Sequence, residues 1–261
     1  MFRSHQGQDQ WVIERALPGK RGGWFIDSGA GPDGIQGSNS FMLESEYGWK
    51  GLLVEPHPDC IARVRANRSA IVEQCCLTDS AGEVDFVLNV HPELSSITEH
   101  LSEPNFTAAG FGPDGHAVVP GLPPPGGLHS VRIPTMPLWE LLRRHHFPPV
   151  IDYLSLDIEG AEWVALKDFP FKEFRILCMT IERGGKAYDK LREKLLAEGY
   201  RLVRVSDPDD FYVHSSVDYR MPFRERMETA LHSAWNTWYA REPLLTARRA
   251  ARRVRRLFRG Y

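Results

Sequence analysis

The stretch WFIDSGAGPDGIQGSNSF, Trp24 to Phe41, decides the fold of this chain. Its pattern predicts a buried strand that ends at Asp27, a glycine-rich turn and the start of a helix. A second apolar strand, GLLVEP, follows ten residues later and ends at Glu55. A glycine turn after one strand and an acid after the next are typical of an open α/β sheet that holds a nucleoside cofactor. Glycine amides approach the ligand closely, and Glu55 can accept bonds from both ribose hydroxyls.

The turn also indicates which cofactor to expect. Gly29, Gly31 and Gly34 have the G-x-G-x-x-G spacing, but the acid Asp27 stands before the first of them, which is unlike the usual dinucleotide fingerprint. A pyrophosphate at a helix N-terminus disfavours a nearby carboxylate, whereas a compound with a sulfonium and an ammonium tolerates one. The pattern therefore favours S-adenosylmethionine over NAD. The alternatives are a capping role for Asp27 and a solvated strand end for Glu55.

The motif YLSLDIEGAEW is the second strong signal. An apolar strand runs into Asp157 and Glu159, and Glu162 opens a helix. The next strand ends at Glu182, so its acid falls at the same sheet edge, unless it merely forms a surface pair with Arg183. Clustered carboxylates oppose folding unless a cation, a sulfonium or a proton offsets their repulsion. Glu162 is the one we assign to favouring the helix N-terminus.

Strand-like and helix-like segments alternate along the chain, which predicts a doubly wound, mainly parallel sheet. The expected strands are 24–27, 51–55, 70–77, 83–88, 152–157, 175–181, 200–205 and 211–214. The expected helices are 41–47, 58–67, 138–145, 161–169 and 187–198.

The bulk composition is that of a soluble globular protein, with 261 residues, 42% of them hydrophobic and 25% charged. The polar N-terminus lacks the apolar segment of a signal peptide, and no apolar run approaches the roughly 20 residues that span a bilayer. We therefore expect a cytoplasmic protein. The four cysteines show no C-x-x-C spacing, and reduced core thiols are expected for them.

The segment from Val90 to Leu128 breaks the alternation with seven prolines and six glycines. A stretch of this kind is either a functional lid or a mobile insertion. Ser95 and Ser96, near its start, are candidates for anchoring a ligand, although a serine pair in a loop is also ordinary turn chemistry.

The C-terminus carries a net charge opposite in sign to that of the rest of the chain. Residues 241–261 contain eight arginines and one glutamate, so the net charge of −2 divides into +7 there and −9 in the first 240 residues. Residues 1–220 are predicted to form the cofactor-binding domain, and residues 221–261 a helical, arginine-rich extension with apolar stripes. Docking of these stripes on the domain or on a sister subunit, as a homodimer, is favoured. A surface helix on anionic lipid is the rival, and a nucleic-acid arm is the weakest alternative.

Four blocks of the chain resemble the signature blocks of the FkbM-type S-adenosylmethionine-dependent methyltransferases. They are FIDSGAGPDGIQGSNSF, GWKGLLVEPHPDC, YLSLDIEGAEW and the TIE that ends at Glu182, in the family's order. The resemblance implies a Rossmann-like class I methyltransferase with strand order 3-2-1-4-5-7-6 and an antiparallel seventh strand. It also implies O-methylation of a hydroxyl on a small molecule, a natural product or a sugar.

The resemblance assigns roles to individual residues around the cofactor. Asp27, Gly29 and Ala30 would line the methionine end of the cofactor, and Ser38 and Asn39 would close the turn. Glu55 would bind the ribose and Asp79 the adenine. Asp157 would face the amino acid part and the reactive methyl group. Taken from the residues alone, Asp79 fits an ordinary turn equally well. The chain departs from the family pattern in a glycine turn one residue longer than usual and in Arg183.

The candidate catalytic residues are Asp157, Glu159 and Glu182, with a histidine such as His91 or His129 as an alternative base. Mg²⁺ is a possible second cofactor, because Asp157 and Glu182 stand where some related O-methyltransferases bind it. Arg183 would oppose a dication and could instead grip a carboxylate substrate. Two other classes stay open, an NAD(P)-dependent oxidoreductase and a non-catalytic protein that binds a membrane or partner through its basic tail.

Overall fold

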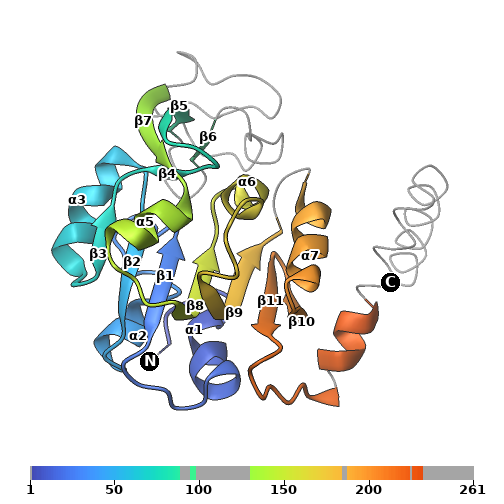
Figure 1. Ribbon diagram of the computed structural model, residues 1–261. Helices are drawn as coiled ribbons and strands as arrows, with labels where there is room; N and C mark the ends of the chain where they lie inside the picture. Colours follow the sequence, from blue (N-terminus) through green and yellow to red (C-terminus); the bar gives the residue numbers. More distant parts are fainter. Residues whose placement is uncertain (1, 89–94, 98–129, 184–186, 224, 232–261) are drawn as a thin grey trace, which may run out of the picture.

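The computed structural model of the chain describes residues 2–88, 95–97, 130–183, 187–223 and 225–231 (Figure 1). Its main element is a seven-stranded sheet in the order β10-β11-β9-β8-β1-β2-β3. The strands are β1 (Trp24–Ser28), β2 (Lys50–Val54), β3 (Ile71–Glu73), β8 (Val150–Leu156), β9 (Arg175–Glu182), β10 (Tyr200–Ser206) and β11 (Asp209–His214). All neighbours are parallel except β11, which is antiparallel to both β9 and β10. Counted along the chain, these seven strands have the predicted order 3-2-1-4-5-7-6, so the class I methyltransferase fold is confirmed.

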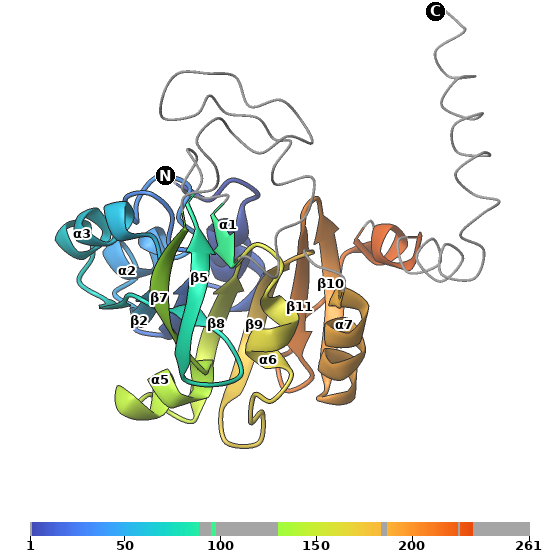
Figure 2. The ribbon, with the colours of Figure 1, turned by 90° about the horizontal axis from the view of Figure 1, so that it is seen from above.

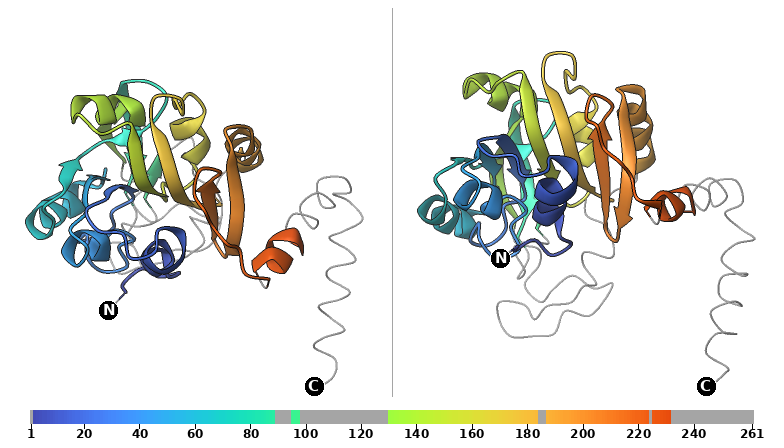
Figure 3. Two further views of the ribbon diagram at one scale, coloured as in Figure 1. Left: turned by 60° about the horizontal axis from the view of Figure 1, so that its bottom comes forward. Right: turned by 90° about the horizontal axis from the view of Figure 1, so that it is seen from below.

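Helices cover both faces of this sheet because its central strands are apolar on both sides. Ile26 and Leu154 point into the core under α5 (Leu138–Arg144), α6 (Glu162–Leu166) and α7 (Tyr188–Ala197). Their neighbours Phe25 and Tyr153 point into the other core. That core is closed by α1 (Gln8–Trp11), the π-helical turn η1 (Val12–Ala16), α2 (Phe41–Ser45) and α3 (Pro58–Asn67). Figures 2 and 3 show the resulting three layers.

A second, four-stranded sheet lies at the carboxyl edge of the first and was not predicted (Figure 1). Its order is β4-β7-β5-β6, from β4 (Cys76–Leu77), β5 (Gly82–Val87), β6 (Ser96–Ile97) and β7 (Ser130–Met136). The apolar run 70–77 was expected to be one strand. Instead it divides, with β3 pairing in the main sheet and β4 pairing with β7. This division connects the two sheets at one side of the candidate site.

Two further expectations need correction or lie outside the structure. The polar N-terminus, for which no element was predicted, forms α1 and η1, and Trp11 and Val12 are buried in the second core. Of the segment 90–128, only residues 95–97 are described, so its interpretation as a lid or insertion stays a prediction. The candidate bases His91 and His129 also lie outside the described residues.

The start of the C-terminal extension does not dock its apolar stripe on the domain, which was one of the two favoured possibilities; docking on a sister subunit stays a prediction. Phe223, Met227 and Leu231 are 77%, 48% and 64% exposed. Within the part of the chain that the structure describes, we find no helix both long and apolar enough to cross a membrane.

Candidate active site

A cavity opens at the carboxyl edge of the main sheet, beside the second sheet. Gly29, Gly31 and Glu55 line it from the turns after β1 and β2, and Asp157 and Glu159 line it from the turn after β8. Its remaining walls are Val54, Pro56, Cys75, Cys76, Leu77, Phe86, Ser95, Ile97, Ile158 and Ala161. The mixture of many apolar walls with a few polar groups is typical of small-molecule pockets.

Gly29 brings the first and fourth strands of the fold into direct contact at this cavity. Its φ is +87°, and a Cβ at this position would lie 2.1 Å from the carbonyl oxygen of Asp157. The amide of Asp157 in turn donates to the carbonyl of Ser28 at 3.1 Å. Only glycine allows both the left-handed conformation and the close approach. The GxG pattern after Asp27 therefore sets the spacing between the glycine turn and the acids after β8.

Asp27 holds the glycine turn from beneath and does not line the cavity. It is 1% exposed and accepts hydrogen bonds from the hydroxyls of Ser40, at 2.6 Å, and Ser38, at 3.4 Å. Burial raises the pKa of Asp27, and the Ser40 hydroxyl and the charge of Arg68 offset part of that rise. Asn39 donates to the Ser155 hydroxyl at 2.8 Å, which closes the turn onto β8. Asp27 and Ser38 thus serve the turn's architecture, whereas the sequence placed Asp27 at the methionine end of a ligand.

Ala30 likewise points away from the cavity. It is 1% exposed and packs in the core with α1 and α3, while its neighbours Gly29 and Gly31 line the pocket. The turn therefore presents backbone to the pocket and side chains to the core, as a ligand cradle made of amides requires.

Arg68 is the residue at this turn that sequence reasoning missed. Its side chain is fully buried and forms an ion pair with Glu44 at 2.8 Å. It also donates to the carbonyl of Gly34 at 2.8 Å and to the hydroxyls of Ser38, at 3.2 Å, and Ser40, at 2.9 Å. These bonds fix the long turn and place a positive charge near Asp27. The only hint in the sequence is an arginine at the end of an otherwise ordinary helix, which is not a specific signal.

Glu55 is buried at the end of β2 and faces the cavity, as predicted. Its Oε1 accepts from the His57 amide at 2.8 Å, which fixes the side chain in the turn. Burial raises the pKa of Glu55 to about 7, and hydrogen bonds from the His57 and Gly31 amides offset part of the rise. A buried carboxylate with unused acceptor capacity is suited to bind a pair of hydroxyls.

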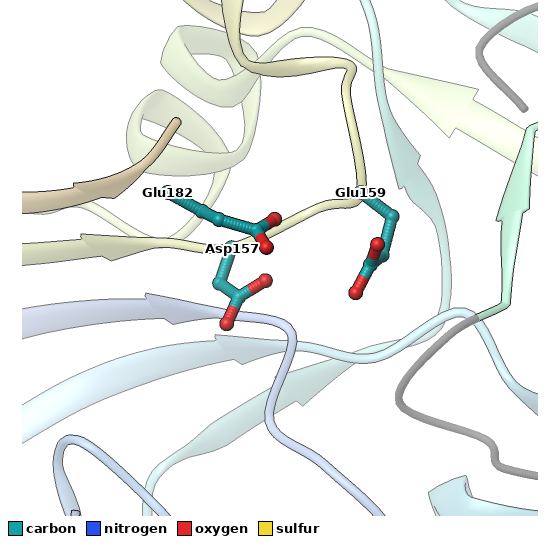
Figure 4. Close-up of side chains that lie close together, drawn as sticks. All are labelled: Asp157, Glu159 and Glu182. Carbon is teal, nitrogen blue, oxygen red and sulfur yellow. The ribbon is translucent and has the colours of Figure 1, made fainter. Parts of the chain in front are cut away.

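The predicted catalytic acids come together at the ends of β8 and β9. Asp157, Glu159 and Glu182 each offer an oxygen, and these oxygens lie within 4.8 Å of one another (Figure 4). Glu159 has a left-handed φ of 55°, and the hydroxyl of Ser96 donates to its carbonyl at 2.9 Å. A residue held in this conformation is a sign of a constrained functional turn. Ser96 therefore anchors the acidic turn itself, and Ser95 lines the cavity.

The electrostatics of this acidic cluster differ from those of an ordinary protein surface. Burial raises the pKa of Glu182 to about 8, and the charges of Glu159 and Glu162 add to the rise. Burial also raises the pKa of Asp157 well above its usual range, and the charge of Glu182 adds to it. Among the described residues, neither Asp157 nor Glu182 forms an ion pair with an arginine or lysine, and Oε2 of Glu182 is buried without a hydrogen-bond partner. The cluster is therefore poised to take up a proton or a cation.

Glu162 has the local role expected of it. It opens α6, is 1% exposed, and its Oε1 accepts from the amides of Ile158, at 3.2 Å, and Gly160, at 3.0 Å. These bonds shape the turn that carries Glu159 and Asp157.

Arg183 does not face the acids, which corrects two expectations about it. It forms ion pairs with Asp210 at 2.7 Å and Asp207 at 2.9 Å, and donates to the carbonyl of Asp209. It is therefore neither the surface partner of Glu182 nor a free group that could grip a carboxylate substrate.

Asp79 is another predicted ligand residue that does not line the cavity. It is exposed and forms an ion pair with Lys167, which lowers its pKa through the hydrogen bond between them. The apolar residues around that end of the pocket, Leu77, Phe86 and Ile97, were not among the predicted site residues. In the sequence these residues belong to apolar patterns, and such patterns do not distinguish the wall of a pocket from a hydrophobic core.

The cysteines behave as expected from their spacing. All four are free and buried. Burial raises the pKa of Cys75 and that of Cys76 to about 12, so the thiols that line the cavity are apolar wall groups at neutral pH.

Comparison with solved structures returns methyltransferase domains. The human methyltransferase 10 domain containing protein aligns at 11% identity over 82% of this chain and 83% of its own, with a TM-score of 0.37. A METTL16 methyltransferase domain with the prefix delta-N aligns at 14% identity over 78% of both chains, with a TM-score of 0.34. The METTL16 catalytic domain in complex with the MAT2A 3′UTR hairpin 6 aligns at 13% identity over 85% of this chain and 75% of its own, with a TM-score of 0.35. No curated protein matches the chain.

The family model of the methyltransferase FkbM domain matches residues 27–202. This match begins at Asp27, includes the glycine turn, Glu55 and the acidic cluster, and extends over more than half of the chain. The chain belongs to the methyltransferase FkbM family.

Proposed function

We propose that this protein transfers a methyl group from S-adenosylmethionine to a hydroxyl oxygen of a small molecule, such as a natural product or a sugar. The observation that carries the proposal is the cavity that Glu55, the glycine turn, Asp157 and Glu159 line, with Glu182 close to the last two acids. In a family of methyltransferases, this is the arrangement that an adenosyl ligand and a neighbouring acceptor need.

The residues present fit the cofactor. Gly29 and Gly31 present backbone to the cavity, Glu55 offers a carboxylate for the ribose hydroxyls, and the apolar walls around Leu77 and Phe86 suit an adenine ring. The acidic cluster complements a sulfonium and an ammonium. When bound, S-adenosylmethionine supplies a methyl group on a positively charged sulfur.

The acidic cluster would handle the proton of the acceptor. Methylation of a hydroxyl forms an ether and releases one proton, which Asp157, Glu159 or Glu182 would accept. A base whose pKa lies near the working pH performs this transfer best, and the pKa of Glu182 is about 8. The turn held by Ser96 and Glu162 would keep these carboxylates in position relative to the methyl donor.

A divalent cation is an additional cofactor that the same residues could hold. Asp157, Glu159 and Glu182 provide three carboxylate oxygens within 4.8 Å of one another, and Mg²⁺ prefers such oxygen ligands. Dialysis against EDTA followed by addition of Mg²⁺ tests this point. Activity that neither treatment changes would assign the cluster to proton transfer alone.

The first experiment is calorimetric titration with S-adenosylhomocysteine. Glu55→Ala should weaken binding by about 10-fold or more, because two hydroxyl hydrogen bonds are lost. Affinity of the unchanged protein should fall as the pH drops below about 7, since only the ionised form of Glu55 accepts both hydroxyls. Asp79→Asn is the matched control, because this acid is exposed and bound to Lys167. Weaker binding by that variant would restore its predicted adenine role.

Two alternatives are tested with the same protein. A rise in melting temperature with NAD and none with S-adenosylhomocysteine would favour an NAD(P)-dependent oxidoreductase. No rise with either ligand would favour a non-catalytic binding protein. Methyl transfer itself is measured as formation of S-adenosylhomocysteine with a panel of hydroxylated small molecules.

A further inference from the structure

The start of the C-terminal extension is an amphipathic helix whose polar side faces the domain and whose apolar side faces solvent. Residues 225–231 are helical, and Glu225 accepts a hydrogen bond from the Tyr219 hydroxyl at 2.9 Å and pairs with Arg15 at 4.0 Å. Thr229, one turn further on, is only 9% exposed. The polar side of this helix therefore faces the domain.

The apolar side faces solvent. At about 100° per residue, Met227 and Leu231 lie roughly opposite Glu225 and Thr229, and Phe223 continues their line. These three apolar side chains are between 48% and 77% exposed, and the adjacent Arg226 is exposed as well. Three large apolar side chains in one row, flanked by the exposed charged residues Arg226 and Glu228, mark an interaction surface rather than scattered surface hydrophobes.

The row continues in the sequence. Trp235 and Trp238 fall on the same line of a helical pattern, and the following 21 residues contain eight arginines and one glutamate. These positions lie outside the described residues, so only their pattern is used. Large apolar and tryptophan residues on one side, followed by a strongly basic segment, form the composition of a helix that lies in a membrane interface.

We infer that the apolar row of Phe223, Met227 and Leu231 docks this protein on an anionic lipid surface, a partner indicated by the basic composition of residues 241–261. The charge of +7 in that segment complements acidic headgroups, and each arginine near such a surface strengthens binding. The row itself would enter the boundary between headgroups and acyl chains.

A second copy of the chain fits this surface less well. Among the described residues, the other large exposed hydrophobic side chains are Val150 and Leu196, which belong to separate elements, β8 and α7. The described surface therefore offers no apolar row other than this one to receive it.

Sedimentation with lipid vesicles tests the inference on the full chain. The protein should sediment with vesicles of phosphatidylcholine and phosphatidylserine, and remain in solution with phosphatidylcholine alone. Met227→Gln combined with Leu231→Gln should weaken vesicle binding by about 10-fold or more, because two apolar side chains no longer enter the interface. Replacing four of the arginines in 241–261 by glutamine should weaken it by about 100-fold or more, and added salt should weaken it too.

Leu196→Gln is the matched control, because Leu196 is 49% exposed on α7 and receives the same kind of substitution. It should leave vesicle binding unchanged. Failure of anionic vesicles to bind the unchanged protein would overturn the inference, as would equal effects of the double variant and the control. A lipid-free dimer that the double variant dissociates would identify a second copy as the partner. Capture of RNA that withstands competition by anionic vesicles would identify a nucleic acid.

Discussion

Asp27 and the acidic cluster stand at the same edge of the main sheet, but their surroundings differ in the hydrogen-bond donors and positive charges that they supply. Asp27, below the glycine turn, is bound by Ser38 and Ser40, and Arg68 lies close enough to offset its charge. Asp157 and Glu182, at the ends of β8 and β9, lie beside each other and beside Glu159. In the described part of the chain they have no arginine or lysine in an ion pair.

The difference separates scaffold from site. A buried acid that its own chain binds and that does not line the cavity stabilises the turn that it holds. Acids that raise one another's pKa destabilise the fold, and such groups are characteristic of functional sites. The glycine turn is therefore the rigid half of the cavity, and the acidic cluster is its chemically responsive half.

The largest effect on the free energy of unfolding should come from removing the positive charge of Arg68, which holds the glycine turn. Arg68→Met should lower the free energy of unfolding by about 3–5 kcal/mol, because it leaves buried acceptors and Asp27 without their compensating charge. Urea denaturation measures it. Arg132→Met is the control, since its ion pairs with Glu83 and Asp85 are exposed and should contribute less than about 1 kcal/mol. Equal losses for the two variants would refute the scaffold role of Arg68.

A somewhat smaller loss should follow from separating the two halves. Gly29→Ala places a Cβ against the carbonyl oxygen of Asp157 and strains a φ of +87°, so the strands β1 and β8 must part. We expect a loss of about 3 kcal/mol in unfolding free energy. Gly48→Ala has a φ of +69° with nothing near its Cβ, and should cost only the backbone strain, about 1 kcal/mol. A difference of zero between these variants would mean that the close contact is not rigid.

The smallest effect should be a pH-dependent gain in stability when Glu182 of the acidic cluster is replaced by glutamine. The pKa of Glu182 is about 8 in the folded protein and near its usual 4.5 when unfolded, so the folded state binds the extra proton. Stability of the unchanged protein should therefore fall as the pH rises from about 4.5 to about 8. Glu182→Gln removes this penalty and should be more stable than the unchanged protein at pH 8, by on the order of 2 kcal/mol relative to the difference at pH 5.

Thermal melting at the two pH values measures this gain in the absence of ligand. Glu83→Gln on β5 is the control, because Glu83 is exposed and paired with Arg132. The variant and the control should differ only at the higher pH. A gain that is the same at both values would show that Glu182 is already ionised in the folded protein and that its neighbours do not repel it.

The fold was largely predictable because its signals are local. Apolar runs marked all seven strands of the main sheet, although the run 70–77 covers both β3 and β4, and the helix of Pro58–Asn67 was predicted to the residue. The second sheet was not predictable in the same way. Its strands β4 and β6 have two residues each, and β4 exists only because β7, more than fifty residues later, pairs with it.

The candidate site likewise contains residues that local sequence signals predict and residues whose role depends on distant parts of the chain. Glu55 and Asp157 are the last residues of two predicted strands, so their presence at the cavity could be inferred from the chain. The turn of Asp27 was recognised, but its side chain serves the scaffold because Ser38 and Ser40 reach it first. The exclusion of Asp79 depends on Lys167, which lies far away in sequence.

The sequence by itself determined the class of fold, the glycine turn and the acids at the strand ends, because each is written in adjacent residues. Only the tertiary structure decided which acids are satisfied and which are not, since that depends on partners such as Arg68 that come from distant elements. It also decided that the apolar row beginning at Phe223 faces outward, because Tyr219 and Arg15 hold the polar side of that helix against the domain.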